Sequence, residues 1–295
     1  MTLALDPDEA RRVARSGARA ERLALHAEMR AAKADAIEGR RALAGELLDG
    51  PETISPQTGL GRASFSDAAL VEAVRAEAYG LAAARGGDSH RDKGSVAYLL
   101  TGADFAPDSA AVTLARSADL LGPVCRYLGM LPILVKIEMT RASADKLLPR
   151  TTHMFHLDPA DTLQVKAFMN LSQVDEDCGP FSALPADLSD TVTARLDYRG
   201  GRVADEEVAA ITGLDRVDAL TGPPGTTGFC DTNRCFHYGG RPAAAGKPKR
   251  DMLMFHYALP TSLLLSDETA GARRMRQLRP TADETWNALI GAVLT

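Results

Sequence analysis

The hydrophobic pattern of this chain changes at residue 133, and that change constrains the fold more than any other feature. Before it, residues 7–48 are rich in strong helix formers, and further helices are expected at about 66–84 and 107–121, with a short strand at 96–100. After it, the pattern is typical of strands and turns up to about residue 259, and Val135, Ile137 and Met139 alternate with their neighbours at the start of this region. A run of helices followed by a run of strands predicts an α+β fold, with helices decorating a β core.

We expect a single domain with three parts: a mainly helical flanking part over residues 1–130, a β core over residues 131–260 and a helical segment over residues 261–295. The chain has 295 residues, of which 45% are hydrophobic, so it can bury one large core. Ser66 is a good N-cap for a helix that runs to about residue 84. The pair Gly122-Pro123 should end a helix that begins near residue 107.

A histidine and an aspartate two residues apart carry candidate chemistry in the β core. If residues 154–158 are extended, His156 and Asp158 project from the same face, because side chains alternate along a strand. An imidazole beside a carboxylate provides two of the three ligands of a facial triad, which binds non-haem Fe(II) and leaves other positions open. Because so short a pattern also occurs by chance, a second and distant histidine is needed.

His237 is the best candidate for this third ligand, because it follows a Gly/Pro-rich turn and precedes the last apolar strand. His153 lies an odd number of residues from His156 and therefore faces away on a regular strand. His256 lies in the last strand, where a core histidine paired to the backbone is the ordinary explanation. The Asp-Thr pair at 231–232 either orients His237 or caps its turn.

Basic residues near these positions are candidates for binding an anion. Arg250 begins the last strand, thirteen residues after His237, and a guanidinium there can clamp a carboxylate with two parallel hydrogen bonds. Arg241 is the alternative, but it lies only four residues after His237. Lys166 belongs to the polar face of an earlier strand, which suits a barrel interior, and it either contacts the same anion or extends to the rim.

Together, these motifs resemble those of the phytanoyl-CoA dioxygenase family of Fe(II)/2-oxoglutarate-dependent oxygenases. The resemblance covers residues 132–260 and includes, in the family's order, H-x-D, V-K-A-F-M-N-L, D-E-D-C-G-P-F, D-T-x-x-x-x-H-x-G-G and R-D-M-L-M-F-H-Y. The segment 181–188 departs from the family, which often has P-G-S-H there, near the substrate. The resemblance therefore does not identify the substrate.

The resemblance implies a double-stranded β-helix, or jelly roll, in which His156, Asp158 and His237 bind iron and Arg250 binds the distal carboxylate of 2-oxoglutarate. Lys166 is a second candidate for contact with 2-oxoglutarate. The implied enzyme is an oxidoreductase that uses Fe(II), 2-oxoglutarate and O2 to hydroxylate an aliphatic C–H bond of a small-molecule metabolite, and that releases succinate and CO2. Related halogenases lack a carboxylate at the position of Asp158, so its presence favours hydroxylation.

Two other classes of function fit the same residues. A non-catalytic jelly-roll protein could retain the fold and bind a metal or another ligand. A metal-dependent enzyme on the same barrel could act without 2-oxoglutarate. The complete triad together with Arg250 argues against the first class, whereas Arg250 alone argues against the second.

Composition excludes several partners. The net charge is −5, the pI is about 5.7 and there is no long basic block, which argues against nucleic acid. No apolar run reaches the ~18 residues of a membrane span, and the acidic residues near the N-terminus argue against a transit peptide. Four cysteines without zinc spacing predict free thiols in the cytoplasm. The N-terminal helices either cover the barrel or form a homodimer contact.

Overall fold

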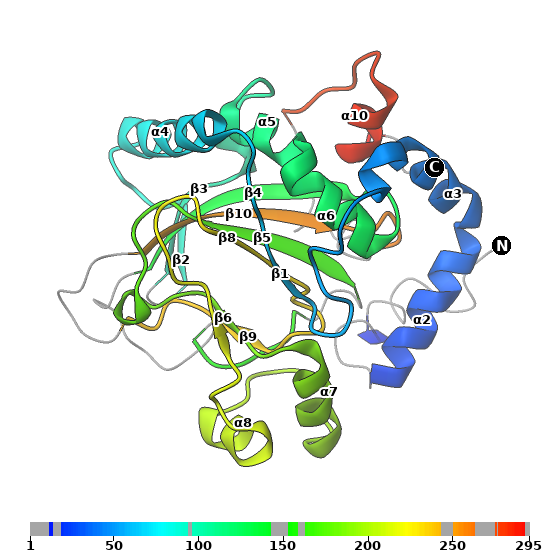
Figure 1. The fold of residues 1–295 in the computed structure, drawn as a ribbon, viewed down its shortest axis with the longest axis vertical. Coiled ribbons are helices and arrows are strands. Elements are labelled where there is room, and N and C mark those ends of the chain that lie inside the picture. Colours follow the sequence, from blue (N-terminus) through cyan, green and yellow to red (C-terminus); the bar gives the residue numbers. More distant parts are fainter. Residues whose placement is uncertain are drawn as a thin grey trace.

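Two antiparallel sheets lie at the centre of the computed structural model (Figure 1). The structure describes residues 12–13, 19–93, 96–142, 153–158, 163–242, 250–262, 275 and 277–292. Within them, the larger sheet has seven strands, in the order β1 (Leu60–Arg62), β8 (Thr227–Cys230), β5 (Gln164–Asn170), β10 (Arg250–Ala258), β4 (Ile133–Ala142), β3 (Val96–Leu100) and β2 (Arg91–Lys93). The smaller sheet has three, in the order β7 (Asp218–Ala219), β6 (Ser182–Ala183) and β9 (His237–Tyr238).

Strand β10 is the central strand of the larger sheet. All of its residues are buried, and it pairs with β4 on one side and with β5 on the other. Leu253, Phe255 and Tyr257 belong to the main hydrophobic core, whereas Met252 and Met254 belong to a second cluster that includes Ala183 of the smaller sheet. Odd-numbered residues of β10 therefore face the helices, and even-numbered residues face the space between the two sheets. Coverage on both faces explains the four consecutive apolar residues 252–255 in this strand.

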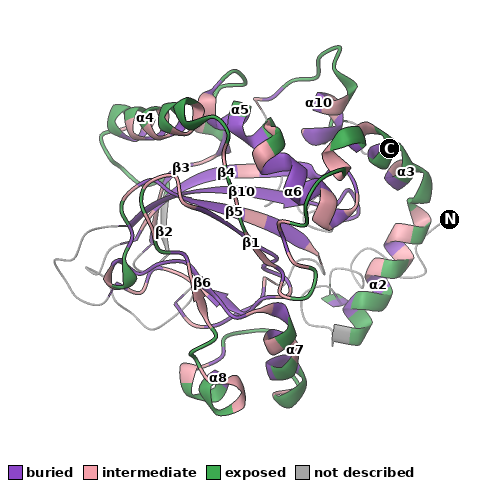
Figure 2. Ribbon diagram, in the orientation of Figure 1, coloured by how far each residue is buried: buried purple, intermediate pink, exposed green. Residues whose placement is uncertain are grey.

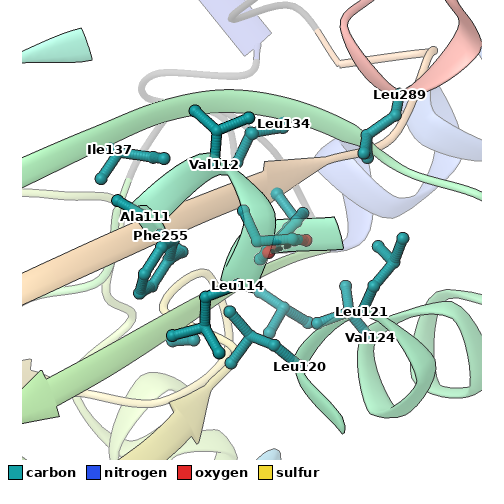
Figure 3. Close-up of a cluster of buried hydrophobic side chains, with 14 of the residues drawn as sticks. Ala111, Val112, Leu114, Leu120, Leu121, Val124, Leu134, Ile137, Phe255 and Leu289 are labelled. Carbon is teal, nitrogen blue, oxygen red and sulfur yellow. Dashed lines mark hydrogen bonds between the residues drawn. The ribbon is translucent and has the colours of Figure 1, made fainter. Parts of the chain in front are cut away.

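The helices cover the outer face of the larger sheet, on the side away from the smaller sheet (Figure 1). They are α4 (Ala68–Ala84), α5 (Ala110–Arg116) and α6 (Ala118–Leu128), with α2 (Arg19–Ala32), α3 (Ala34–Ala44) and α10 (Glu284–Leu289) toward one end. Figure 3 shows side chains of α5 and α6 packed over Ile137 of β4 and Phe255 of β10. Figure 2 shows that α4 exposes its outer face, whereas α6 is buried along most of its length. Trp286 and Leu289 dock α10 on this core.

Two helix ends differ from the prediction. Asp67, rather than Ser66, is the N-cap of α4, and its side chain accepts the backbone N–H of Leu70 at 2.9 Å. The break before α6 falls at Ser117, which caps the end of α5 and the start of α6, and Pro123 lies inside α6. A capping serine satisfies the free N–H groups of a new helix, whereas a proline one turn inside costs one intrahelical hydrogen bond.

Further strands and helices complete the fold. Strands β1, β2 and β3 come from the first hundred residues and join the larger sheet. Helices α7 (Ala186–Arg195) and α8 (Asp205–Thr212) lie beyond the smaller sheet, and Val192 of α7 packs in one cluster with Val208 of α8 (Figure 1). Short 3-10 turns occur at Gly45–Leu48, Gly102–Asp104 and Glu176–Cys178. Among the described helices, none has the length and apolar character that crossing a membrane requires.

Candidate metal centre

The structure brings His156, Asp158 and His237 together. One potential ligand atom from each lies within 4.8 Å of the others. The two histidines come from antiparallel segments that exchange backbone hydrogen bonds: His156 N donates to His237 O at 3.2 Å, and His237 N donates to His156 O at 3.0 Å. Asp158 follows two residues later on the same face, as the alternation of an extended segment predicts. Among the described residues this is the only such group of three.

The imidazoles present the same nitrogen toward the cluster. His156 Nδ1 lies 3.0 Å from the carbonyl oxygen of Met154, and His237 Nδ1 lies 3.0 Å from that of Cys235. A carbonyl oxygen only accepts, so each Nδ1 carries the proton and each Nε2 keeps its lone pair, the arrangement found in metal-binding histidines. Burial, and then the neighbouring imidazole, lowers the pKa of His156 to about 3, and burial lowers the pKa of His237. Both rings are therefore neutral and suited to a cation.

Asp158 is held through its backbone and its carboxylate. Its N–H donates to Thr232 O at 2.8 Å, and its carbonyl accepts from Asn233 Nδ2 at 2.7 Å. Its Oδ2 accepts from Lys166 Nζ at 2.5 Å and from Gln164 Nε2 at 3.0 Å. Burial would raise the pKa of Asp158, but the positive charge of Lys166 holds that pKa well below its ordinary value. The carboxylate is thus ionised, with one oxygen bonded twice.

Arg250 provides a buried positive charge in the same interior. It lies at the start of β10 and is 2% exposed. Its guanidinium lies beside Gly239, because a Cβ built there would be 3.7 Å from Nη1. Its Nε and Nη1 have no hydrogen-bond partner in the described part of the chain. Burial lowers the pKa of Arg250 to about 10, so it remains charged at neutral pH. Buried charged donors without acceptors are costly, which favours an anionic ligand here.

The alternative arginine, Arg241, is already paired. Its guanidinium bonds Asp205 at 2.6 and 2.9 Å and lies 3.4 Å from the centre of the Tyr238 ring. It ties the loop after β9 to α8 and leaves Arg250 as the candidate for an anion. Lys166, the second candidate, bonds Asp158, which places it in the metal cluster.

The wall of this interior beside His237 is apolar. The rings of Phe168 and Phe181 stack with centroids 3.9 Å apart, and the Phe181 ring lies 5.7 Å from that of His237. Met252 and Met254 of β10 belong to the same buried cluster. An apolar wall of this kind excludes water from the neighbourhood of the candidate ligands and strengthens electrostatic interactions there.

The rival histidines do not join the cluster. His153 and His256 are buried, but neither belongs to the group of three. The expectation that His256 pairs with the backbone was wrong, because its Nε2 lies 2.7 Å from the side-chain Oε1 of Gln164. Sequence reasoning missed Gln164, although it is two residues before Lys166 and therefore shares its face of β5. That periodicity was the signal that could have found it.

Asp231 stabilises its own turn, whereas Thr232 accepts hydrogen bonds from Gln164 through Oγ1 and from Asp158 through its carbonyl oxygen. Asp231 is fully buried and accepts from Tyr127 Oη at 2.8 Å and from Asn233 N at 3.1 Å. Burial raises the pKa of Asp231 to about 7. The four cysteines, at 125, 178, 230 and 235, are buried and free, which confirms the prediction of free thiols.

Comparisons with known proteins identify the fold. No family model and no curated protein matches the sequence. Among solved structures, EctD from S. alaskensis in its apoform is similar at 15% identity and a TM-score of 0.51, over 72% of this chain and 80% of EctD. EctD has also been crystallised with bound Fe, and with 2-oxoglutarate and 5-hydroxyectoine. SnoK, a non-heme alpha ketoglutarate dependent carbocyclase from nogalamycin biosynthesis, is similar at 16% identity and a TM-score of 0.50, over 72% and 88% of the two chains. At such identities the likeness shows the fold alone.

Proposed function

We propose that this protein is an Fe(II)/2-oxoglutarate-dependent dioxygenase, related to the phytanoyl-CoA dioxygenase family and built as one domain around a double-stranded β-helix. The observation that carries the proposal is the pairing of a His-Asp-His cluster with a buried arginine that has unsatisfied donors in the same interior. The fold shared with EctD and SnoK supports it, because EctD has been crystallised with Fe and with 2-oxoglutarate. The substrate would be a small molecule.

The donor set fits Fe(II). His156 and His237 would bind it through neutral Nε2 atoms, and Asp158 through a carboxylate oxygen, which together form a facial triad of two histidines and one carboxylate. When bound, the iron, with O2 and 2-oxoglutarate, supplies the oxidising chemistry that hydroxylates an aliphatic C–H bond and leaves succinate and CO2. The carboxylate of Asp158 occupies the position that related halogenases keep free for a halide, which favours hydroxylation.

Arg250 would bind the distal carboxylate of 2-oxoglutarate, since a carboxylate can accept two parallel hydrogen bonds from one guanidinium. Its burial makes this contact strong, because water does not compete for the donors. The apolar wall formed by Phe168, Phe181 and the two methionines of β10 would keep water out of the space beside the co-substrate. Lys166 would contribute a second positive charge near the metal and the co-substrate.

The test measures succinate formation by the purified protein supplied with Fe(II), 2-oxoglutarate and O2. We expect slow turnover even without the substrate, and no turnover in His156→Ala or Asp158→Ala, although both should keep their circular dichroism spectra. His153→Ala is the matched control, because His153 is a buried histidine outside the cluster, and it should retain turnover. Iron binding without consumption of 2-oxoglutarate would support a metal enzyme of another class. Absence of iron binding would support a non-catalytic binding protein.

A further inference from the structure

Gln164 is the most connected buried side chain next to the candidate metal centre. It begins β5 and is 1% exposed. Its Nε2 lies 3.0 Å from Asp158 Oδ2 and 2.7 Å from Thr232 Oγ1, and its Oε1 lies 2.7 Å from His256 Nε2. One amide thus joins a candidate ligand, the turn that precedes His237 and the central strand of the sheet.

The partners of this amide determine which way it points. An ionised carboxylate only accepts hydrogen bonds, so the NH2 group must face Asp158 and the oxygen must face His256. His256 therefore donates from Nε2. Burial lowers the pKa of His256 well below its ordinary value, so the ring is neutral and has a single N–H for this bond. A flipped amide would place oxygen against the carboxylate and NH2 against an N–H, and would lose both bonds.

The sheet supports the same arrangement. In the pairing of β10 with β5, His256 lies opposite Lys166 and Ala258 lies opposite Gln164. His256 and Gln164 are therefore diagonal neighbours on one face of adjacent strands, within reach of each other. Both strands pair with a neighbour on each side in the larger sheet, so the two side chains start from an ordered backbone.

We propose that His256 and Gln164 form a positioning relay, in which His256 fixes the Gln164 amide and Gln164 fixes the distal oxygen of Asp158. This inference rests on the proposed metal centre. Lys166 bonds the same Oδ2, but through a long chain with a freely rotating ammonium group, so it neutralises the carboxylate without fixing its plane. Gln164 is bonded at both ends of its amide. The relay turns the second oxygen of Asp158 toward the two imidazoles and so increases the affinity of the site for a divalent metal.

The test is the affinity for Co²⁺ alone, measured by anaerobic titration of the d–d absorption in the metal-free protein. Gln164→Met removes both donors at nearly constant volume and should weaken Co²⁺ binding by about 10- to 100-fold, the usual effect of losing a hydrogen-bond partner of a ligand. His256→Leu should weaken it by less, because Gln164 remains. His256→Gln offers an amide N–H near the position of Nε2 and should restore most of the affinity.

A double-mutant cycle separates a relay from two independent structural effects. If His256 acts through Gln164, then Gln164→Met/His256→Leu should bind Co²⁺ as Gln164→Met does, whereas independent effects would multiply. Asn170→Leu is the matched control, because Asn170 is a buried amide on the same face of β5. It should lower stability without changing Co²⁺ affinity. Wild-type affinity in Gln164→Met, or multiplied losses in the double variant, would overturn the relay. A wild-type protein that binds Co²⁺ but never consumes 2-oxoglutarate would instead refute the proposed function and leave the relay measurable.

Discussion

Replacing Arg250 with methionine should separate stability from co-substrate binding. Methionine has similar length and no charge, so Arg250→Met removes a buried guanidinium that has unsatisfied Nε and Nη1 groups in the described structure. Because burying a charge with unsatisfied donors is costly, replacing it with an apolar group of similar length should be neutral or stabilising. We therefore expect the free protein to unfold at the same urea concentration as the wild type, or at a higher one.

The affinity of Arg250→Met for 2-oxoglutarate should fall, although its stability does not. Removing one partner of a buried, hydrogen-bonded charge pair costs about 2–5 kcal/mol, which corresponds to a loss of affinity of about 30-fold to a few thousandfold. The assay is thermal unfolding with Co²⁺, with and without 2-oxoglutarate. A ligand at about 100 times its Kd adds about 2.7 kcal/mol of stability, which raises the Tm by roughly 5–10 °C in a large domain. The variant should lose this rise.

Arg40→Met is the matched control. Arg40 is also a buried arginine, but its guanidinium donates to the carbonyl oxygens of Leu131, Pro132 and Ala288 at 3.0, 3.3 and 2.7 Å. Its loss leaves those acceptors unsatisfied, so the control should be destabilised and should keep its response to 2-oxoglutarate. The reasoning fails if Arg250→Met keeps the full Tm rise, or if it is destabilised as much as the control.

Three further predictions concern charge, metal affinity and packing. The pKa of Asp231 is raised to about 7 in the folded protein and is about 3.9 in the unfolded chain, so the metal-free protein should lose stability as pH rises from about 4 to 7, by up to ~1.4 kcal/mol per pH unit. In urea unfolding, the stability of Asp231→Asn should depend less on pH than that of the wild type. The same pH dependence in both proteins would contradict a buried acid at this position. Lys166→Met should tighten Co²⁺ binding at least about tenfold, because the ammonium group of Lys166 is bonded to Asp158 and repels a cation there. Weaker Co²⁺ binding by the variant in a titration would show that this charge repulsion is not the dominant effect. Trp286→Ala should lower the free energy of unfolding in urea by about 3–5 kcal/mol, and a loss below 1 kcal/mol would mean that α10 is not docked in solution.

The local pattern predicted the β core and two of the three residues of the cluster. Alternation along 154–158 places His156 and Asp158 on one face, and the apolar residues after Arg250 and Asp251 predict the last strand of the core. The structure has both features. The position of His237 beside that pair does not follow from periodicity, because it depends on pairing between segments 81 residues apart. It was expected from the place of His237 between a Gly/Pro-rich turn and the last apolar strand, and from the order and spacing of motifs that resemble a family.

The supporting contacts could not be predicted for the same physical reason. Gln164, Thr232 and His256 approach one another across three separate elements, and no local pattern specifies which side chains meet. The predicted helix boundaries were wrong for a different reason. The sequence predicts a helix end at Pro123. In the structure the helix break lies at Ser117, which caps the start of α6, and Pro123 is tolerated inside that helix.

Strand β10 carries Arg250 at its start and His256 six residues later, so it fixes a spacing of about 20 Å between the two ends of the site. This spacing tolerates substitutions in β10 but not a change in the length of the strand. Deleting one residue between Arg250 and His256 would move every side chain after the deletion to the opposite face of the sheet, although the amino-acid composition would be almost unchanged. Libraries that retune this protein should therefore vary the identities of residues in β10 and never their number.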